Sequence, residues 1–498
     1  MDVILFMKYN LNQLFKNYKI NGLSTNSQTV KENEVFFALK GQNVDGNDFI
    51  NDALNNGAVL VITENKKNTV IDKVIYVEDV YEALYEAIEI FYPKKPKNLI
   101  SVTGTNGKSS VVSYIAQTYF LLRKKAAFIG TIGLEIFGCN NIINDVPSLT
   151  TLDYLNFRKI AHNLAEDSIE YLAFEASSHG LEQGRLGKTK VNIVSFTSFS
   201  QDHLDYHHTK ENYLLAKLKL FTDHLLPSGI AILNSDIEEI EFVKDYLRNN
   251  NVKFITVGKK GDVQITKITC SLTGQNIDFI FNNIIYNLHT LIIGSFQASN
   301  LLIAALTLYY TGFKFDEIIE ALSKVKPVKG RMERIDGTNI FVDYSHTPDA
   351  LEKALIELQN IKPHGGKLSV IFGCGGDRDK TKRGLMGKIA AKFADNVIIT
   401  DDNPRFEDPK LIRTEIIRGI GTATYTEIES REEAIKYGIN NLKQDDILLI
   451  AGKGHENYQI VGDKKLPFDD SEVVRKYLFS MSCTRNQQKH LVSSRTVV

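Results

Sequence analysis

The sequence predicts an α/β protein of three domains, and three observations support this. From residue 98 onward, short apolar runs alternate with helical patterns, as in residues 98–102 followed by 111–122, which favours a largely parallel sheet covered by helices. The alternation restarts beyond residue 330, where residues 340–343 are strand-like and residues 348–359 are helical. The 498 residues also suffice for about three domains of roughly 150 residues each.

The expected elements fix the domain boundaries. A basic, proline-punctuated segment at residues 93–97 predicts a linker, and a second boundary is expected between Pro327 and Gly330. We therefore predict domains at 1–96, 97–328 and 329–480, followed by a polar, disordered tail at 481–498. The further strand-like runs are residues 34–39, 58–62, 127–130, 171–174, 193–197, 230–233, 368–372, 396–400 and 447–450, with a helix at 48–56 and a β-rich region at 252–294.

Composition excludes several function classes. The net charge of −1 gives no electrostatic footprint for nucleic acid, and the apolar runs are too short to span a bilayer. The four cysteines (139, 270, 374 and 483) lie far apart and form no C-x-x-C pair, which is typical of free thiols in a reducing compartment. We expect a cytoplasmic protein with neither a nucleic-acid nor a membrane partner.

Residues 103–110, TGTNGKSS, are the most informative segment of the chain. They connect a strand-like run to a helical run, so that backbone N–H groups and a helix N-terminus would face an anion. In such a loop Lys108 would reach the outer phosphates of a nucleotide, and the Ser109 hydroxyl would bind Mg²⁺. Val102 replaces the first glycine of the full pattern, so a tight turn with a surface lysine is the alternative.

Polar residues of the central segment are candidates for the chemistry. Glu175 ends a strand, where carboxylates of nucleotide sites bind metal, although a helix N-cap is an alternative. His203 and His207 have i,i+4 spacing, but no third zinc ligand is nearby and a polar loop is the commoner structure. Lys217 lies in an otherwise apolar helix, where a snorkelling side chain is the alternative to a buried one.

The C-terminal segment contains two candidate loops. Residues 373–379, GCGGDRD, follow a strand with a glycine turn and then charges, which suits an anion. Residues 402–405, DNPR, follow the next strand, and Arg405 can bind a carboxylate through two parallel hydrogen bonds. Alone, a turn of this kind is usually structural.

Together these motifs closely resemble those of the Mur ligases, the ATP-dependent amino-acid ligases of peptidoglycan synthesis. The resemblance covers residues 20 to 475. It implies a small N-terminal α/β uridine-binding domain, a central P-loop-type ATPase domain with a mostly parallel sheet, and a C-terminal Rossmann-like α/β domain. The motifs are GTNGKS (104–109), EASSH (175–179), DHLDYH (202–207), YLLAK (213–217), GRME (330–333), VDYSHTPD (342–349), DNPR (402–405) and AGKGHENYQ (451–459).

The last two motifs resemble the branch of the family that adds meso-diaminopimelate. The implied reaction joins it to the D-glutamyl γ-carboxylate of UDP-MurNAc-L-Ala-D-Glu through an acyl phosphate, with ATP as cosubstrate. The nearest alternative is an L-lysine-adding ligase, against which Arg405 argues. More distant alternatives are folylpolyglutamate synthetase, which lacks the uridine-binding domain, and a non-catalytic nucleotide switch or scaffold. A monomer is the simpler expectation.

The resemblance implies site residues, position by position. The catalytic residues are Lys108, Glu175, His203 and Lys217. ATP would contact Gly104, Thr105, Asn106, Gly107, Lys108, Ser109, Ser110, Arg331 and Asp343. The UDP-MurNAc-dipeptide would contact Ser27, Gln42, Asn43, Val44, Thr150, Thr151, Ser177, Gln183 and Arg185. Diaminopimelate would contact Arg378, Asp402, Asn403, Pro404, Arg405, Gly452 and Glu456. A pair of Mg²⁺ ions would lie near Ser109, Glu175, His203 and Lys217, the last carboxylated by CO₂ to N6-carboxylysine.

Three positions depart from the family pattern. Gln28 follows Asn26-Ser27 where the family has Asp-Ser-Arg, Leu152 replaces a proline, and Gln297 replaces an asparagine. These departures concern the uridine and adenine contacts rather than the reaction.

Overall fold

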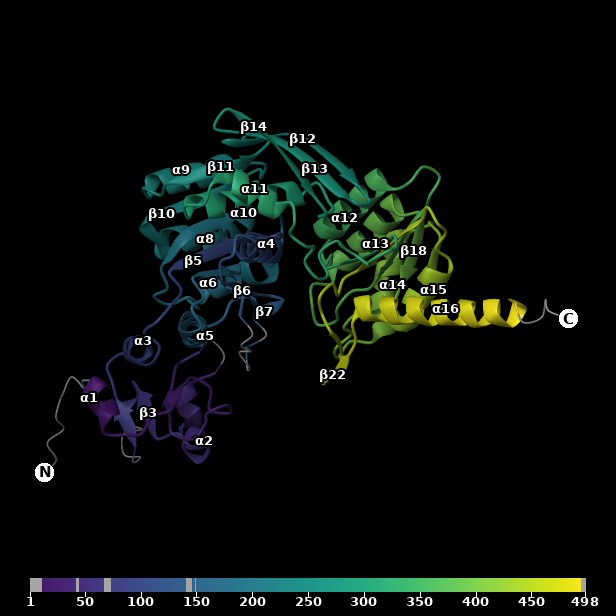
Figure 1. The fold of residues 1–498 in the computed structure, drawn as a ribbon. Helices are drawn as coiled ribbons and strands as arrows, with labels where there is room; N and C mark the ends of the chain where they lie inside the picture. Colours follow the sequence, from purple (N-terminus) through teal and green to yellow (C-terminus); the bar gives the residue numbers. More distant parts are fainter. Residues whose placement is uncertain (1–10, 42–43, 67–72, 140–145, 148, 494–498) are drawn as a thin grey trace, which may run out of the picture.

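The computed structural model describes residues 11–41, 44–66, 73–139, 146–147 and 149–493, with side chains up to residue 481. Figure 1 shows three bodies, with the central one between an N-terminal and a C-terminal body. Each body is built around one sheet, of four, ten and six strands respectively. No helix among the described residues is long and apolar enough to cross a membrane.

The N-terminal body is a four-stranded parallel sheet in the order β1-β2-β3-β4. The strands β2 and β3 are fully buried because both of their faces pack against helices or loops. Asp79 is the N-cap of helix α3, and its side chain accepts hydrogen bonds from the Tyr81 and Glu82 amides. The elements are α1 (Leu11–Lys16), β1 (Gly22–Ser24), β2 (Glu34–Phe37), η1 (Gly46–Phe49), α2 (Ile50–Asn55), β3 (Leu60–Thr63), β4 (Val74–Tyr76) and α3 (Val80–Phe91).

The central sheet has the order β14-β13-β12-β11-β10-β9-β5-β8-β6-β7, and the strands from β12 to β6 pair in parallel. Helices α4 and α10 pack against each other and bury almost every side chain because both are apolar on most faces. The strands are β5 (Asn98–Thr103), β6 (Ala126–Gly130), β7 (Gly133–Phe137), β8 (Tyr171–Glu175), β9 (Val191–Phe196), β10 (Leu225–Asn234), β11 (Phe254–Gly258), β12 (Val263–Ser271), β13 (Gly274–Phe281) and β14 (Ile284–Thr290). The helices are α4 (Lys108–Leu121), α5 (Tyr154–Glu166), α6 (Ser178–Glu182), α7 (Leu204–His207), α8 (Lys210–Lys219), η3 (Leu220–His224), α9 (Ile240–Asn249), α10 (Gln297–Tyr310) and α11 (Phe315–Leu322).

The C-terminal sheet has the order β15-β16-β20-β17-β18-β19, parallel except for β15. Strand β20 lies between β16 and β17 and is buried along its whole length. The strands are β15 (Glu333–Arg334), β16 (Ile340–Asp343), β17 (Leu368–Phe372), β18 (Asn396–Ile399), β19 (Tyr425–Glu427), β20 (Ile447–Ala451), β21 (Tyr458–Val461) and β22 (Lys464–Pro467). The helices are α12 (Pro348–Ile361), α13 (Thr381–Phe393), α14 (Pro409–Ile420), α15 (Arg431–Asn440) and α16 (Asp470–Ser493).

The hairpin of β12 and β13 extends from the central body toward the C-terminal body (Figure 1). At its turn the Leu272 carbonyl accepts a hydrogen bond from Arg334 Nη1 at 2.7 Å. Cys270 and Leu272 pack, together with Ile293, against the apolar core between the C-terminal sheet and its helices. The hairpin therefore ties the two bodies together at a distance from the linker around residue 328.

The sequence predicted the α/β class and the strand-helix alternation, and both are confirmed. The expected disordered tail is wrong for residues 481–493, because helix α16 continues to Ser493. Residues 470–493 contain neither Gly nor Pro, so nothing in them interrupts a helix once it has started. Residues 494–498 lie outside the described part of the chain, and the domain boundaries remain a prediction.

Candidate active site

The loop between β5 and α4 has the geometry of an anion cradle. Gly104 and Gly107 both have positive φ, of 145° and 90°. A Cβ on Gly107 would lie 2.7 Å from Asn300 Oδ1, so both the backbone conformation and the space require glycine. Gly107 is also the N-cap of α4, so the loop lies at the N-terminus of that helix, where the first amides have no partner within the helix.

Two lysines, Lys217 buried and Lys108 partly buried, converge on one carbonyl group of this loop. Lys108 Nζ donates to Gly104 O and to Thr105 O, each at 2.9 Å, and Lys217 Nζ donates to Gly104 O at 2.9 Å. Lys217 is 1% exposed and lies 4.3 Å from the ring centre of Tyr213. Burial, and next the Lys108 charge, lower the pKa of Lys217 well below its usual value; burial likewise lowers the pKa of Lys108. The snorkelling alternative for Lys217 is therefore wrong.

Glu175 is fixed at the end of β8. Its Oε1 accepts from the Thr131 amide at 2.9 Å, and its Oε2 accepts from Thr131 Oγ1 at 3.0 Å. Thr131 Oγ1 is in turn 3.0 Å from Thr150 Oγ1. The carboxylate is thus a buried, oriented acceptor next to a predicted substrate residue, and Ser177 rather than Glu175 is the N-cap of α6.

The predicted muramoyl-peptide residues of the central body form one hydrogen-bonded network. Thr151 Oγ1 donates to Ser177 Oγ at 3.0 Å and accepts from the Ser177 amide at 2.8 Å. Arg185 donates through Nε to Gln183 Oε1 at 2.9 Å and through Nη1 to Thr151 O at 3.2 Å. Thr150 joins this network through Thr131. The structure therefore brings these five predicted residues together beside Glu175.

A cluster of histidines lies next to this network. The ring centres of His179 and His203 are 4.6 Å apart, and those of His179 and His207 are 5.4 Å apart. Burial lowers the pKa of His203 and of His207 to about 4 and also lowers that of His179. All three imidazoles are neutral at pH 7, so each can serve as a ligand or as a hydrogen-bond donor and acceptor.

A cavity of about 570 Å³ lies between the central and C-terminal bodies. Five predicted ATP residues line it, namely Asn106, Gly107, Ser110, Arg331 and Asp343.

Arg331 bridges the two bodies at this cavity. Its Nη2 donates to Ser109 Oγ at 3.2 Å, and its guanidinium lies 4.5 Å from the ring centre of Tyr344. Burial raises the pKa of Asp343, whose Oδ1 accepts from the Met332 amide at 2.6 Å. The C-terminal body thus contributes a cation to the phosphate loop of the central body and a carboxyl group to the cavity beside it.

Sequence reasoning missed other residues that line this cavity. Asp349 Oδ2 accepts from Asn106 Nδ2 at 3.4 Å, from Ser200 Oγ at 3.2 Å and from Lys353 Nζ at 2.9 Å. Asn300 contacts Gly107 and donates through Nδ2 to Gln297 Oε1 at 2.9 Å. Asp349 is the last residue of the motif 342–349, which is the sequence signal for it. Asn300 gave no comparable signal, because its place depends on the packing of α10 against α4.

The predicted diaminopimelate residues meet at the carboxyl ends of β17, β18 and β20, where open α/β sheets bind ligands. Arg405 has φ of 53°, and its Nη1 donates to Gly376 O at 2.7 Å. Asn403 Nδ2 donates to Glu456 Oε2 at 2.9 Å. Gly452 has φ of 115°, and a Cβ there would lie 2.7 Å from Asp402 Oδ2. Arg378 lies in a bend beside them, and its Nη1 donates to the Asp377 carbonyl at 3.3 Å.

Buried arginines hold these loops in place. Arg383 donates to Gly375 O at 3.1 Å and to both carboxylate oxygens of Glu407, which joins the loop after β17 to the loop after β18. Arg431 donates to both oxygens of Asp470 and to Ala451 O, which anchors the end of β20 to the start of α16. Pairing with Arg383 lowers the pKa of Glu407 to about 2, so this anchor stays charged at all ordinary pH values.

Of the predicted uridine residues, Ser27 and Val44 lie in the described part of the N-terminal body. Ser27 is buried, and its carbonyl accepts from Asn56 Nδ2 at 2.9 Å, whereas the side chain of Val44 is 56% exposed. Gln42 and Asn43 lie outside the described residues. Asn26 Oδ1 accepts from the Gln28 amide at 3.0 Å. Residues 26–28, which differ from the Asp-Ser-Arg of the family, are therefore joined by a local hydrogen bond.

The donor set near the phosphate loop fits Mg²⁺ held largely by substrate oxygens. In the described part of the chain, no three His, Cys, Asp or Glu side chains are grouped to hold a metal ion. A buried carboxylate (Glu175), a hydroxyl (Ser109) and a neutral imidazole (His203) are nevertheless present. Mg²⁺ typically uses one or two carboxylates together with phosphate oxygens and water, so this sparse set suits it better than Zn²⁺.

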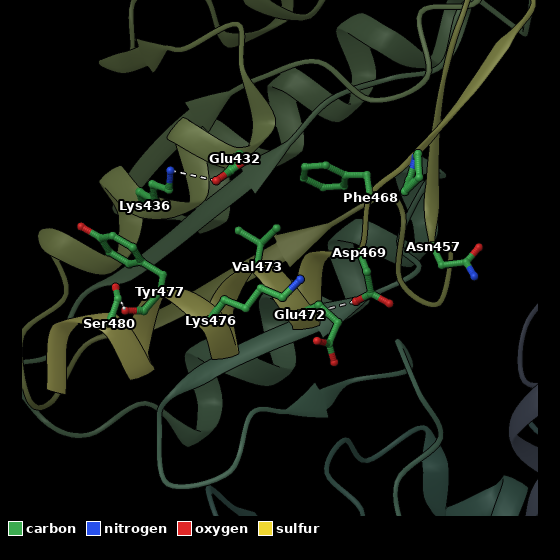
Figure 2. A pocket seen from close by; sticks show the side chains of 11 residues that line it. Glu432, Lys436, Asn457, Phe468, Asp469, Glu472, Val473, Lys476, Tyr477 and Ser480 are labelled. Carbon is green, nitrogen blue, oxygen red and sulfur yellow. Dashed lines mark hydrogen bonds and ion pairs between the residues drawn. The ribbon is translucent and has the colours of Figure 1, made fainter. Parts of the chain in front are cut away.

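A second cavity, of about 650 Å³, opens between α15, α16 and the segment before α16 (Figure 2). Among its lining side chains Lys436 pairs with Glu432 at 2.8 Å. None of the predicted site residues lies among those that line it.

Comparisons with known proteins agree with this geometry. Three family models match the chain: "Mur ligase family, catalytic domain" at residues 19–103, "Mur ligase middle domain" at 102–308 and "Mur ligase, glutamate ligase domain" at 330–454. UDP-N-acetylmuramoyl-L-alanyl-D-glutamate–2,6-diaminopimelate ligase of Rickettsia prowazekii is 92% identical over 480 residues, which are 96% of this chain and 100% of the relative. The chain belongs to the Mur ligase family. The family resemblance drawn from the motifs is thereby confirmed.

More distant Mur ligases extend the comparison. The ligase of the same name from Zymomonas mobilis is 39% identical over 478 residues, covering 94% of this chain and 96% of the relative. A solved structure of a protein with that name superimposes with a TM-score of 0.65 at 32% identity, covering 93% of this chain and 95% of the other. The likeness to Mur ligases thus extends over nearly the whole chain in both sequence and fold.

Proposed function

We propose that this chain is an ATP-dependent ligase that joins meso-diaminopimelate to the D-glutamyl γ-carboxylate of UDP-MurNAc-L-Ala-D-Glu. The observation that carries this conclusion is the 92% identity, over its full length, to a relative whose name states these two reactants. The pocket around Arg405 and Glu456, within the matched glutamate ligase domain, supports the choice of amino acid.

The proposed reaction has two steps, and the atoms balance in each. A γ-carboxylate oxygen of the D-glutamyl residue attacks the γ-phosphorus of ATP, ADP leaves, and an acyl phosphate forms. An amine of diaminopimelate then attacks the acyl carbon, phosphate leaves, and the amine loses a proton as the amide forms. Both steps gather negative charge at the phosphate loop, where Lys108 and the N-terminus of α4 would stabilise it.

Ser109, Glu175, His203 and the carbamate of Lys217 would hold Mg²⁺, which neutralises phosphate charge when bound. The lowered pKa of Lys217 supports the carbamate, because only a neutral amine adds to CO₂. In that addition the Nζ–C bond forms, a proton is released, and the side chain becomes an anion. The pair of Mg²⁺ ions belongs to this proposal.

The remaining predicted roles complete the proposal. The nucleotide would lie in the cavity lined by Arg331 and Asp343, against the loop from Gly104 to Ser110. The network around Thr151 and Arg185 would hold the muramoyl peptide. Ser27, Gln42, Asn43 and Val44 would line the uridine pocket of a domain spanning residues 1–96, with further domains at 97–328 and 329–480. We also propose that the enzyme acts in the cytoplasm as a monomer.

The diaminopimelate pocket would recognise a second amino-acid head. Arg405 would pair with its carboxylate, and Glu456 would accept from its ammonium. L-Lysine lacks that carboxylate and would leave Arg405 unpaired, at a cost of roughly 1–3 kcal/mol.

A phosphate-release assay tests the proposal. We expect release only when ATP, UDP-MurNAc-L-Ala-D-Glu and meso-diaminopimelate are all present, with tripeptide product seen by mass spectrometry. Efficient release with L-lysine in place of diaminopimelate would instead support the lysine-adding alternative. Release that does not depend on any amino acid would contradict both.

A further inference from the structure

Lys453 is a fully buried lysine that the reaction described above does not use. It follows the end of β20 and is 0% exposed, so its ammonium group is out of contact with bulk water. A buried ammonium is costly unless it is paired and hydrogen-bonded. Its partners therefore show what it does in the fold.

Its hydrogen-bond and ion-pair partners belong to the proposed diaminopimelate pocket. Lys453 Nζ donates to Asn403 Oδ1 at 2.9 Å and to Glu456 Oε2 at 3.1 Å, and it lies 3.7 Å from Asp402 Oδ1. These acceptors come from the loops after β18 and β20. One ammonium group thus joins the two loops that carry the pocket.

These hydrogen bonds determine what each pocket side chain can still offer a ligand. Asn403 Oδ1 accepts from Lys453 and from the Ile460 amide at 2.9 Å, and Asn403 Nδ2 donates to Glu456 Oε2 at 2.9 Å. Because both donors on Oδ1 are N–H groups, the orientation of the amide is fixed. Among the described side chains, Asn403 and Lys453 donate hydrogen bonds to Glu456, and both bonds end on Oε2. The other carboxylate oxygen, Oε1, therefore remains to accept from a ligand.

The charges of this group lead to the same conclusion. One ammonium lies between two carboxylates, those of Glu456 and Asp402, so the group retains one negative charge. That charge favours a second, incoming ammonium. Without Lys453 the two carboxylates would repel each other, and Glu456 would lose the bond that orients it.

We propose that Lys453 is a positioning residue for amino-acid recognition. Its buried ammonium holds Asn403 and Glu456 so that Glu456 Oε1 accepts the distal ammonium of an amino acid with two amino-acid heads. The inference rests on the proposed function, because it concerns the same site. It adds a residue that acts on the substrate through its neighbours.

The test compares Lys453→Met with Lys388→Met, a change of an exposed lysine on α13 of the same body. Phosphate release is measured while meso-diaminopimelate, ATP and UDP-MurNAc-L-Ala-D-Glu are varied in turn, and the melting temperature is recorded. For Lys453→Met we expect KM for diaminopimelate to rise about 10- to 100-fold, the size of effect that follows removal of a side chain that orients a metal ligand. We expect KM for ATP to stay within about threefold of the original, and Lys388→Met to change neither constant.

Glu456→Gln and the double variant Lys453→Met/Glu456→Gln test whether Lys453 acts through Glu456. If it does, the rise in KM for diaminopimelate in the double variant is smaller than the product of the rises in the two single variants. If Lys453→Met does not fold, Lys453→Gln replaces it, because its amide group keeps N–H donors in the pocket without the positive charge.

Three outcomes would overturn the inference: an unchanged KM for diaminopimelate, a parallel rise of all three KM values, or losses that multiply in the double variant. Failure of the unaltered enzyme to release phosphate with all three substrates would instead overturn the proposed function.

Discussion

Replacing Arg405 by alanine should remove the preference for diaminopimelate over L-lysine. The Arg405 side chain is held in a defined direction, because Nη1 donates to Gly376 O at 2.7 Å and the backbone amide donates to Ile460 O at 3.1 Å. Five N–H donors belong to a guanidinium, so Nε and Nη2 remain for a two-point contact with a carboxylate.

The magnitude follows from this geometry. A hydrogen bond to a charged group contributes about 1.5–3 kcal/mol, and about 1.4 kcal/mol corresponds to a factor of ten. L-Lysine has no distal carboxylate and loses nothing when the guanidinium is removed. The ratio of kcat/KM for diaminopimelate to kcat/KM for L-lysine should therefore fall by about 10- to 150-fold in Arg405→Ala.

The assay is phosphate release at saturating ATP and UDP-MurNAc-L-Ala-D-Glu, with each amino acid varied. Arg418→Ala is the matched control, since Arg418 is an exposed arginine at the end of α14 in the same body. A ratio in Arg405→Ala equal to that of the control would refute the assignment of Arg405 to the distal carboxylate.

Two further predictions concern buried charges. The side chains of Arg431 and Asp470 are both 0% exposed and are paired through two hydrogen bonds. Asp470→Asn should therefore lower the free energy of unfolding by about 3–5 kcal/mol. Urea unfolding followed by circular dichroism measures this change, and a loss below about 1 kcal/mol would contradict the prediction. Burial lowers the pKa of Lys217 in the folded protein well below the value of 10.5 that it has in the unfolded chain. At pH values between these two pKa values the unfolded chain binds more protons than the folded protein, so the free energy of unfolding rises with pH. Lys217→Met should flatten that rise by up to about 1.4 kcal/mol per pH unit in CO₂-free buffer at pH 8–9.5, and an unchanged slope would refute the lowered pKa.

Sequence patterns predicted the site wherever a loop follows directly from a strand. The phosphate loop and the segment 402–405 each follow a strand of a parallel sheet, and Glu175 is the last residue of one. The alternation of strands and helices therefore predicted that they lie at the carboxyl edge of a sheet. The burial of Lys217 had only a weak signal in the sequence, an apolar helix around it.

Other residues depended on contacts between distant segments. Asp349 contacts Asn106 across 243 positions, and Lys453 contacts Asn403 across 50, so neither pairing has a local pattern. Lys453 stood within a quoted motif, but its burial results from the central place of β20 in the sheet. The helix at residues 481–493 was missed because its polar sequence lacks amphipathic periodicity, the signal on which a helix prediction depends.

The hairpin of β12 and β13 limits how the protein can be divided for separate study. A chain started just after residue 328 would retain the C-terminal sheet but lose Cys270, Leu272 and Ile293, which cover part of its apolar core. A chain stopped there would expose the same side chains to water. Fragments cut at the linker should thus aggregate more readily than the intact enzyme, and isolated halves would need polar substitutions on these surfaces.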